Sequence, residues 1–296
     1  MDEAGLRRRR ALLQIHLCVM LWAFTAILGR LITLPATQLV AWRLILVVAG
    51  MALVPRVWRS IRSIGPRQTL VFMGIGAVVA LHWLAFYGAI KASNASVATI
   101  CLAIAPVAIA LLDPWLHGGR LRPWDVALGI AVVPGIVLIV GGIPAGMQRG
   151  IWFGVAAALL VAVYMMLNKQ WIGQQDPLGV TALEFAGGLL ITLAILPWVG
   201  PIAPAGFLPA GRDLLLLVVL AVFCTILPFA LSLIALREVS AFTAQLAVNL
   251  EPIYAMAIAA WLLGEATELG LLFYLGAALV VLAVLGHGML SARGRA

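Results

Sequence analysis

Two stretches of this chain share one pattern. Residues 89–118 read AIKASNASVATICLAIAPVAIALLDPWLHG, and residues 235–264 read ALREVSAFTAQLAVNLEPIYAMAIAAWLLG. At a constant offset of 146 residues, a cation precedes each apolar run, a proline interrupts it, and Trp-Leu-x-Gly closes it. Agreement of so many features in one register indicates an internal repeat. We therefore interpret the chain as two halves, residues 1–146 and 147–296.

The composition places the chain in a membrane. Hydrophobic residues make up 64% of the sequence and charged residues 10%, with a mean hydropathy of +1.13. A soluble chain of 296 residues could not bury that much apolar surface in one core. We therefore expect an integral membrane protein.

Apolar segments bounded by proline, glycine and charged residues predict ten spanning helices. Those of the first half are expected at residues 11–32, 37–54, 69–90, 95–112 and 123–142. Those of the second half are expected at residues 150–171, 178–199, 213–236, 241–263 and 268–290. The expected fold class is therefore all-α, with five helices per half. Because five is odd, the halves enter the membrane from opposite sides and form an inverted repeat, which suits alternating access.

The distribution of Lys and Arg predicts the orientation. The formal net charge of +8 comes from basic residues next to apolar runs, such as Arg7 to Arg10 and the cluster Arg56, Arg59, Arg62 and Arg67. Cytoplasmic loops of membrane proteins carry this excess. Both termini are therefore expected in the cytoplasm, and a nucleic-acid partner is not expected because no basic stripe is interleaved with aromatic residues.

Motifs for several other function classes are missing from the sequence. It contains no G-x-x-x-x-G-K-[ST] phosphate loop and no G-x-S-x-G nucleophile elbow. The four histidines lack metal-ligand spacing, and the three cysteines fall in apolar segments without paired spacing. We therefore expect no catalytic site, metal or cofactor. Catalytic residues scattered along the sequence without a recognisable motif remain an alternative.

The chain resembles the EamA family of drug/metabolite transporters. The resemblance rests on the ten expected spans in two halves, on His-Trp-x-x-Phe-Tyr-x-Ala-x-x-x-Ser at His82 to Ser93, and on Leu-Glu-Pro at Leu250 to Pro252 followed by Gly264-Glu265. It implies a basket of ten helices around a central cavity. The first four helices of each half would line that cavity, with the fifth and tenth outside. Family members move small metabolites, often exporting amino acids or toxic compounds.

Charged groups at membrane depth are the first candidates for function, because each is costly there unless it faces protein or water. Glu251 could carry a proton or meet a substrate ammonium group, or it could satisfy backbone groups freed by Pro252. Arg43 could bind a substrate carboxylate, since its guanidinium fork matches that geometry. A structural ion pair between Arg43 and either Glu251 or Glu184 is the alternative.

Other polar and aromatic residues are candidates for the lining of the cavity. His82 could hydrogen-bond substrate or titrate near neutral pH, or it could bond to a neighbouring carbonyl. Aromatic walls with a few polar groups are typical of small-molecule pockets, and many of these side chains could also serve packing alone. The remaining candidates are Trp22, Trp42, Tyr87, Thr99, Tyr164, Asn168, Gln245, Asn249 and Tyr254.

These observations together predict a transporter of the bacterial inner membrane that exports a small metabolite, with amino acids favoured. Transport would be secondary active or facilitative, by alternating access, and protons are a candidate coupling ion. Uptake of a similar solute is one alternative, and a polytopic scaffold or membrane enzyme is another. The sequence leaves open whether the protein is a monomer or a homodimer.

Overall fold

The computed structural model describes residues 3–117, 123–198, 206–209, 211–235, 247–248 and 250–293. Within these ranges the fold consists of helices and contains no strand. Six helices are long and apolar enough to cross a membrane, or seven if α2 and α3 form one bent span. Three shorter apolar helices cover residues 126–141, 251–262 and 271–286. The all-α membrane fold agrees with the sequence, whereas the count of ten spans stays a prediction.

The first half contains seven helices in its described residues. They are α1 (Glu3–Leu31), α2 (Ala36–Ala52), α3 (Pro55–Arg62), α4 (Pro66–Ala92), α5 (Ala95–Leu102), α6 (Ala105–His117) and α7 (Pro123–Gly141). Two features differ from the expectation. The basic segment after Pro55 forms the short helix α3, because proline suits the first turn of a helix. The helix expected at 95–112 is divided into α5 and α6.

The short turn η1 (Ala145–Met147) joins α7 to α8 across the expected boundary between the halves. The division at residues 146/147 stays a prediction, and part of the helix expected at 241–263 lies outside the described residues. The remaining elements are α8 (Gln148–Trp171), α9 (Pro177–Ile195), α10 (Gly211–Ala221), the π-helical turn η2 (Val222–Ile226), α11 (Leu227–Ala235), α13 (Glu251–Leu262), η3 (Glu265–Thr267) and α14 (Leu271–Arg293).

Both halves interrupt a helix at the same place in the repeat. Helix α5 ends at Leu102 and α6 begins at Ala105, while α13 begins at Glu251, which aligns with Ala105 at the offset of 146 residues. Pro106 and Pro252 are the second residues of α6 and α13. Proline has no N–H to donate to the carbonyl four residues earlier, so a continuous helix would lose a hydrogen bond at this point.

The turns at the two breaks share an equivalent backbone hydrogen bond. Ile104 N–H donates to the Cys101 carbonyl at 3.0 Å, and Leu250 N–H donates to the Ala247 carbonyl at 3.0 Å. These pairs are equivalent at the offset of 146 residues. The repeat detected in the sequence is therefore also a repeat of local backbone geometry.

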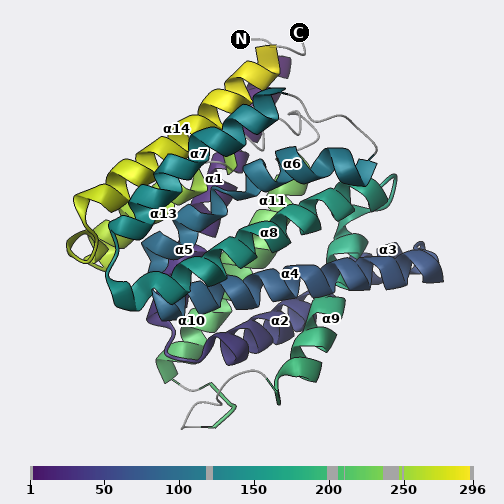
Figure 1. Cartoon of the computed structure of the whole chain (residues 1–296). Coiled ribbons are helices and arrows are strands. Elements are labelled where there is room, and N and C mark those ends of the chain that lie inside the picture. The colour runs from purple at the N-terminus through teal and green to yellow at the C-terminus, as the bar shows by residue number, and fades with distance from the viewer. Residues whose placement is uncertain are drawn as a thin grey trace.

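Close helix contacts organise the bundle. Helices α4 and α8 run side by side, as do α7 and α14 at the edge of the molecule (Figure 1). Helix α4 also packs on α9 through glycine: a Cβ at Gly76 would lie 1.8 Å from the Glu184 carbonyl oxygen, and one at Gly187 would lie 2.1 Å from the Met73 carbonyl oxygen. Small residues allow this approach of two backbones in membrane helices. The contact fixes the position of α9, and with it the Glu184 side chain.

Candidate functional site

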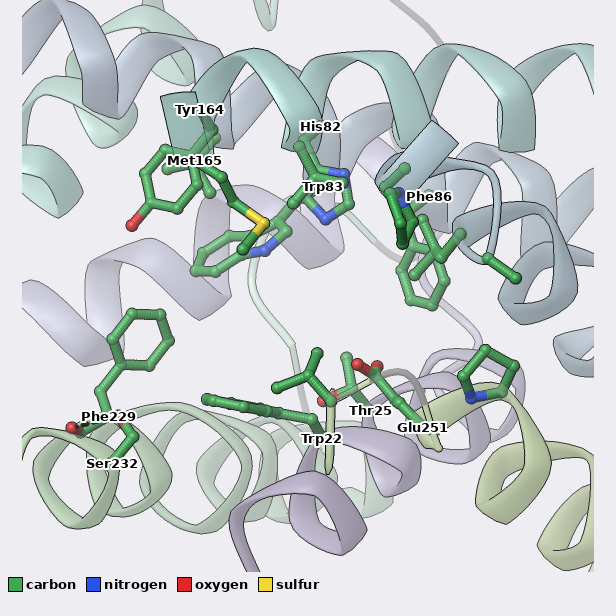
Figure 2. Close-up of a pocket in the computed structure, with 18 of the residues that line it drawn as sticks. Trp22, Thr25, His82, Trp83, Phe86, Tyr164, Met165, Phe229, Ser232 and Glu251 are labelled. Atoms are coloured by element: carbon green, nitrogen blue, oxygen red, sulfur yellow. Dashed lines mark hydrogen bonds between the residues drawn. The ribbon is translucent and has the colours of Figure 1, made fainter. Parts of the chain in front are cut away.

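A cavity of about 300 Å³ lies at the centre of the bundle and is lined from both halves of the chain. His82, Trp83 and Phe86 of α4 form one wall together with Tyr164 and Met165 of α8 (Figure 2). The opposite wall carries Trp22, Thr25, Phe229, Ser232 and Glu251 from α1, α11 and α13 (Figure 2). Residues of both helix breaks also line the cavity, namely Leu102, Ala103, Ala105 and Pro106 in the first half and Val248, Glu251 and Pro252 in the second.

Arg43 of α2 lines the cavity although its side chain is only 2% exposed. Its Nε donates to Thr225 Oγ1 at 3.1 Å, and its Nη1 donates to the Tyr87 hydroxyl at 2.9 Å. The guanidinium carbon lies 3.7 Å from the centre of the Trp83 ring, a cation–π contact. All three partners are neutral side chains, so none of them offsets the charge of the guanidinium at the cavity.

The π-helical turn η2 positions Thr225 for this contact. In η2 the Thr225 hydroxyl donates to the Leu220 carbonyl, five residues earlier, at 3.0 Å. Its oxygen is thereby oriented to accept the hydrogen bond from Arg43. Single π-turns of this kind are frequent at functional sites.

Glu251 is the first residue of α13 and lines the same cavity as Arg43. In the described part of the chain no ion pair joins Arg43 to Glu251 or to Glu184. The structural ion pair considered from the sequence is therefore absent from these residues. A carboxylate at the start of a helix is favoured by the helix dipole, which helps to hold Glu251 at this position.

Glu184 of α9 belongs to a separate hydrogen-bonded group beside the cavity. Its side chain is 1% exposed and accepts from the Tyr164 hydroxyl at 2.9 Å and from Asn168 Nδ2 at 2.6 Å. Tyr164 lines the cavity, whereas Asn168 and Glu184 do not. Glu184 therefore fixes the orientation of the Tyr164 hydroxyl from the side that faces away from the cavity.

His82 lines the cavity and also bonds to the backbone. Its Nδ1 lies 2.8 Å from the Ala157 carbonyl oxygen of α8. Since a carbonyl only accepts, Nδ1 carries the proton, and this contact fixes the ring against α8. The ring stacks on Phe86, with centroids 6.1 Å apart. The backbone-bonded arrangement considered from the sequence is the one found.

The other candidates from the sequence lie away from the cavity or outside the described residues. Trp42 donates from Nε1 to the Phe207 carbonyl at 2.7 Å. The Thr99 hydroxyl donates within α5 to Ala95, and Tyr254 Oη lies 3.4 Å from His16 Nδ1. Tyr87 contacts Arg43 from behind the cavity wall. Gln245 and Asn249 fall outside the described residues.

Several lining residues were not among the candidates chosen from the sequence. Trp83, Phe229 and Met165 are apolar, and nothing in their spacing distinguishes them from packing residues. Val281 and Val284 of α14 also line the cavity, so the tenth helix is not wholly outside it, as the family resemblance implied. Both valines are buried on the inner side of α14, which also packs on α7.

Beyond the cavity, a buried carboxylate joins the two halves at one end of the bundle. Glu265 of η3 is 1% exposed and accepts from the N–H groups of Ala95 and Ser96, each at 2.9 Å, and from the Ser96 hydroxyl at 2.7 Å. These N–H groups belong to the first turn of α5, so a residue of the second half caps a helix of the first.

Further polar contacts surround the Glu265 cap. Asn94 Nδ2 donates to Glu268 Oε2 at 3.0 Å, and Arg30 Nη2 lies 3.8 Å from Glu268 Oε1. The Thr33 hydroxyl donates to Asp213 Oδ2 at 2.6 Å. We call this end of the bundle the latch face and define it by Arg30, Thr33, Asn94, Asp213, Glu265 and Glu268. The Gly264-Glu265 pair was noted in the sequence, but its cross-half contact was not foreseen.

Comparison with known proteins agrees with this architecture. The family described as the EamA-like transporter family matches residues 9–141 and again residues 148–288. A comparison with curated proteins gave no match. A solved structure titled only as the crystal structure of a protein is 19% identical over 97% of this chain and 99% of that chain, with a TM-score of 0.64, which supports the fold alone. The chain belongs to the EamA-like transporter family and is a multi-pass membrane transporter of small solutes.

Proposed function

We propose that this protein exports small metabolites that carry both a positive and a negative group, with amino acids as the favoured class. One observation carries the proposal: a single cavity is lined by Arg43 and by Glu251, and the two do not form an ion pair in the described residues. A guanidinium and a carboxylate that face one cavity can each bind the opposite charge of a zwitterion.

The helix breaks support the same substrate class. The first N–H groups of a helix carry a partial positive charge, and α6 begins at the cavity with Ala105, which has no charge of its own. In α13 the equivalent position is Glu251. Interrupted helices whose N-termini face the site are a recurring feature of secondary transporters. A substrate carboxylate would thus lie near Arg43 and α6, and its ammonium group near Glu251.

Alternating access is the proposed mechanism. The latch face ties α5 of the first half to η3 of the second half through hydrogen bonds of Glu265. Opening the cavity at this end requires these bonds to break, while the inverted halves exchange conformations around the cavity. Glu251 is the proposed site of a coupling proton, because it is the carboxylate among the lining residues.

The excess of basic residues at the other end of the bundle supports a cytoplasmic location for that end, with both termini inside and the latch face outside. We propose the bacterial inner membrane as the location.

The experiment measures efflux from liposomes that contain the purified protein and a labelled amino acid, with and without an imposed proton gradient. Competition by the free amino acid, by its amide and by the corresponding decarboxylated amine tests which charged groups are recognised. We expect the amino acid to compete at least about tenfold better than either analogue, since each analogue leaves one buried charge unpaired.

Arg43→Met should abolish the preference for the carboxylate, whereas Arg149→Met, on an exposed position of α8, serves as the matched control. Equal competition by all three compounds would argue against a zwitterionic substrate. Flux only into the vesicles would favour uptake, and no flux of any labelled solute would favour a scaffold or membrane enzyme.

A further inference from the structure

Helix α3 lies at a right angle to the helix that precedes it. The axes of α2 and α3 meet at 89° across a break of two residues, and α2 is apolar enough to form part of a span. A helix perpendicular to a span runs parallel to the membrane plane. Its sequence, PRVWRSIR, combines arginines with a tryptophan, which is typical of helices at the boundary between headgroups and acyl chains.

The two sides of α3 have different environments. Val57 and Ser60 are buried against the bundle, where Ser60 Oγ lies 3.5 Å from the Asp176 carbonyl at the start of α9. Trp58 is 49% exposed, and its indole N–H donates to the Ala52 carbonyl at 2.8 Å. Leu53, just before α3, is 83% exposed. This corner therefore presents apolar side chains beside its basic ones.

A cavity of about 490 Å³ opens between α3 and the start of α9. It is lined by Arg56, Arg59, Ser60, Ser63 and Asp176, so two guanidinium groups and two hydroxyl groups border one space. The cavity is wide enough for a phosphate group, and its lining carries an excess of positive charge.

The one acidic group in the lining is already engaged by the protein. Asp176 Oδ1 accepts from Leu178 N–H at 3.1 Å and so caps α9, and its Oδ2 lies 3.8 Å from Arg56 Nε. In the described chain Arg59 has no carboxylate partner. The positive charge that Asp176 does not neutralise is thus available to bind an anion that is not part of the chain.

We propose that this cavity binds the phosphate of an anionic phospholipid headgroup. Arg56 and Arg59 donate to the phosphate oxygens, and the acyl chains run past Leu53 and Trp58. Charge complementarity favours an anion, and the perpendicular helix with its exposed apolar neighbours favours a lipid over a soluble phosphate. Because α3 packs on the start of α9, the bound lipid joins the first half to the second. The proposal does not depend on which solute is transported.

The test is lipid retention by the intact purified protein, measured by native mass spectrometry after delipidation and addition of phosphatidylglycerol. The double variant Arg56→Gln/Arg59→Gln removes two charges from the cavity. The matched control Arg62→Gln/Arg67→Gln removes two charges from exposed positions nearby that do not line it. We expect at least about tenfold less bound phosphatidylglycerol for the cavity variant and about twofold less for the control, because only the cavity arginines contact the phosphate.

Equal losses in both double variants would overturn the proposal, since they would indicate general attraction of anionic lipid to basic residues. Equal retention of phosphatidylcholine, or displacement of the lipid by an equal concentration of glycerol phosphate, would also overturn it. If the cavity variant does not fold, Ser63→Asp decides the question. It places a negative charge at an exposed edge of the cavity and should reduce retention by a similar factor.

Discussion

At the scale of single residues, the most informative feature is a buried arginine held by neutral partners. Arg43 has lost nearly all contact with water, yet its hydrogen bonds go to two hydroxyl groups and its face lies on Trp83. Burying a charge without a counter-ion is costly, so such groups are retained mainly where function needs them. An anionic group of a substrate would supply the missing counter-charge.

Arg43→Lys tests whether the guanidinium geometry matters beyond its charge. A lysine cannot donate to Thr225 and Tyr87 from a planar fork, so we expect the free energy of unfolding to fall by about 1 to 3 kcal/mol. Thermal unfolding in detergent measures the stability, and efflux from liposomes measures the transport. We expect weaker apparent affinity for the substrate. Unchanged affinity together with reduced stability would leave Arg43 with a structural role only.

Glu251→Gln tests the proposed coupling role. The substitution keeps the shape and hydrogen bonding of the side chain while it removes the charge, so flux should fall more than the amount of folded protein. The dependence of flux on a proton gradient should disappear, and exchange of labelled for unlabelled substrate should persist only at higher substrate concentration, since the ammonium group loses its partner. Normal flux with unchanged pH dependence would show that Glu251 is structural.

At the scale of elements, the two interrupted helices deliver backbone N–H groups and Glu251 to one cavity. Pro106→Ala should allow α5 and α6 to join, because the new N–H can donate to the Leu102 carbonyl. A continuous helix would gain about 3 kcal/mol, enough to shift a conformational equilibrium more than about a hundredfold. We expect transport to fall while folded protein is retained. Pro134→Ala in α7 is the control, and equal loss of flux in both would contradict the proposed role of the break.

The cap on α5 offers a second prediction at this scale. Glu265→Gln replaces a carboxylate that accepts three hydrogen bonds with a neutral amide whose NH₂ group faces other donors. We expect the latch face to be destabilised by about 2 to 3 kcal/mol. A cysteine introduced at Ala95 should then react faster with a thiol reagent in the Glu265→Gln variant than in the protein that retains Glu265. Glu268→Gln, a partly exposed neighbour, should have a smaller effect, and identical rates in all three proteins would argue that this face does not open.

At the scale of the whole molecule, the proposed orientation can be tested by labelling. Cysteine at Leu208, which is 72% exposed in the segment between α9 and α10, should react with a membrane-impermeant thiol reagent in intact cells. Cysteine at Arg62 of α3 should react only after the cells are permeabilised. The background should lack Cys18, Cys101 and Cys224, all of which are buried. The reverse labelling pattern would show that the protein has the opposite orientation in the membrane.

The sequence by itself predicted the all-α membrane fold with two repeats, which the structure and the family match confirm. The boundary at residues 146/147 and the membrane depth of Arg43, Glu184 and Glu251 stay predictions. These predictions use local information. The length of an apolar segment indicates a span, a proline indicates a helix break, and similar residues at a constant spacing along the chain indicate a repeat. Trp22, Arg43, His82, Tyr164 and Glu251 were chosen from polarity and helix position, and all of them line the cavity.

Only the tertiary structure decided which of these groups meet. In the described part of the chain Arg43 donates to Thr225 and Tyr87 and forms no ion pair with a glutamate, and Glu184 accepts from Tyr164 and Asn168. The π-turn at Thr225, the cap that Glu265 places on α5 and the perpendicular course of α3 also arise from packing. Each depends on how a helix is rotated and how closely it approaches its neighbours. In so apolar a chain nearly every face of a helix is hydrophobic, so the pattern of apolar residues does not indicate which face of a helix points inward. Contacts between residues far apart in the sequence determine it.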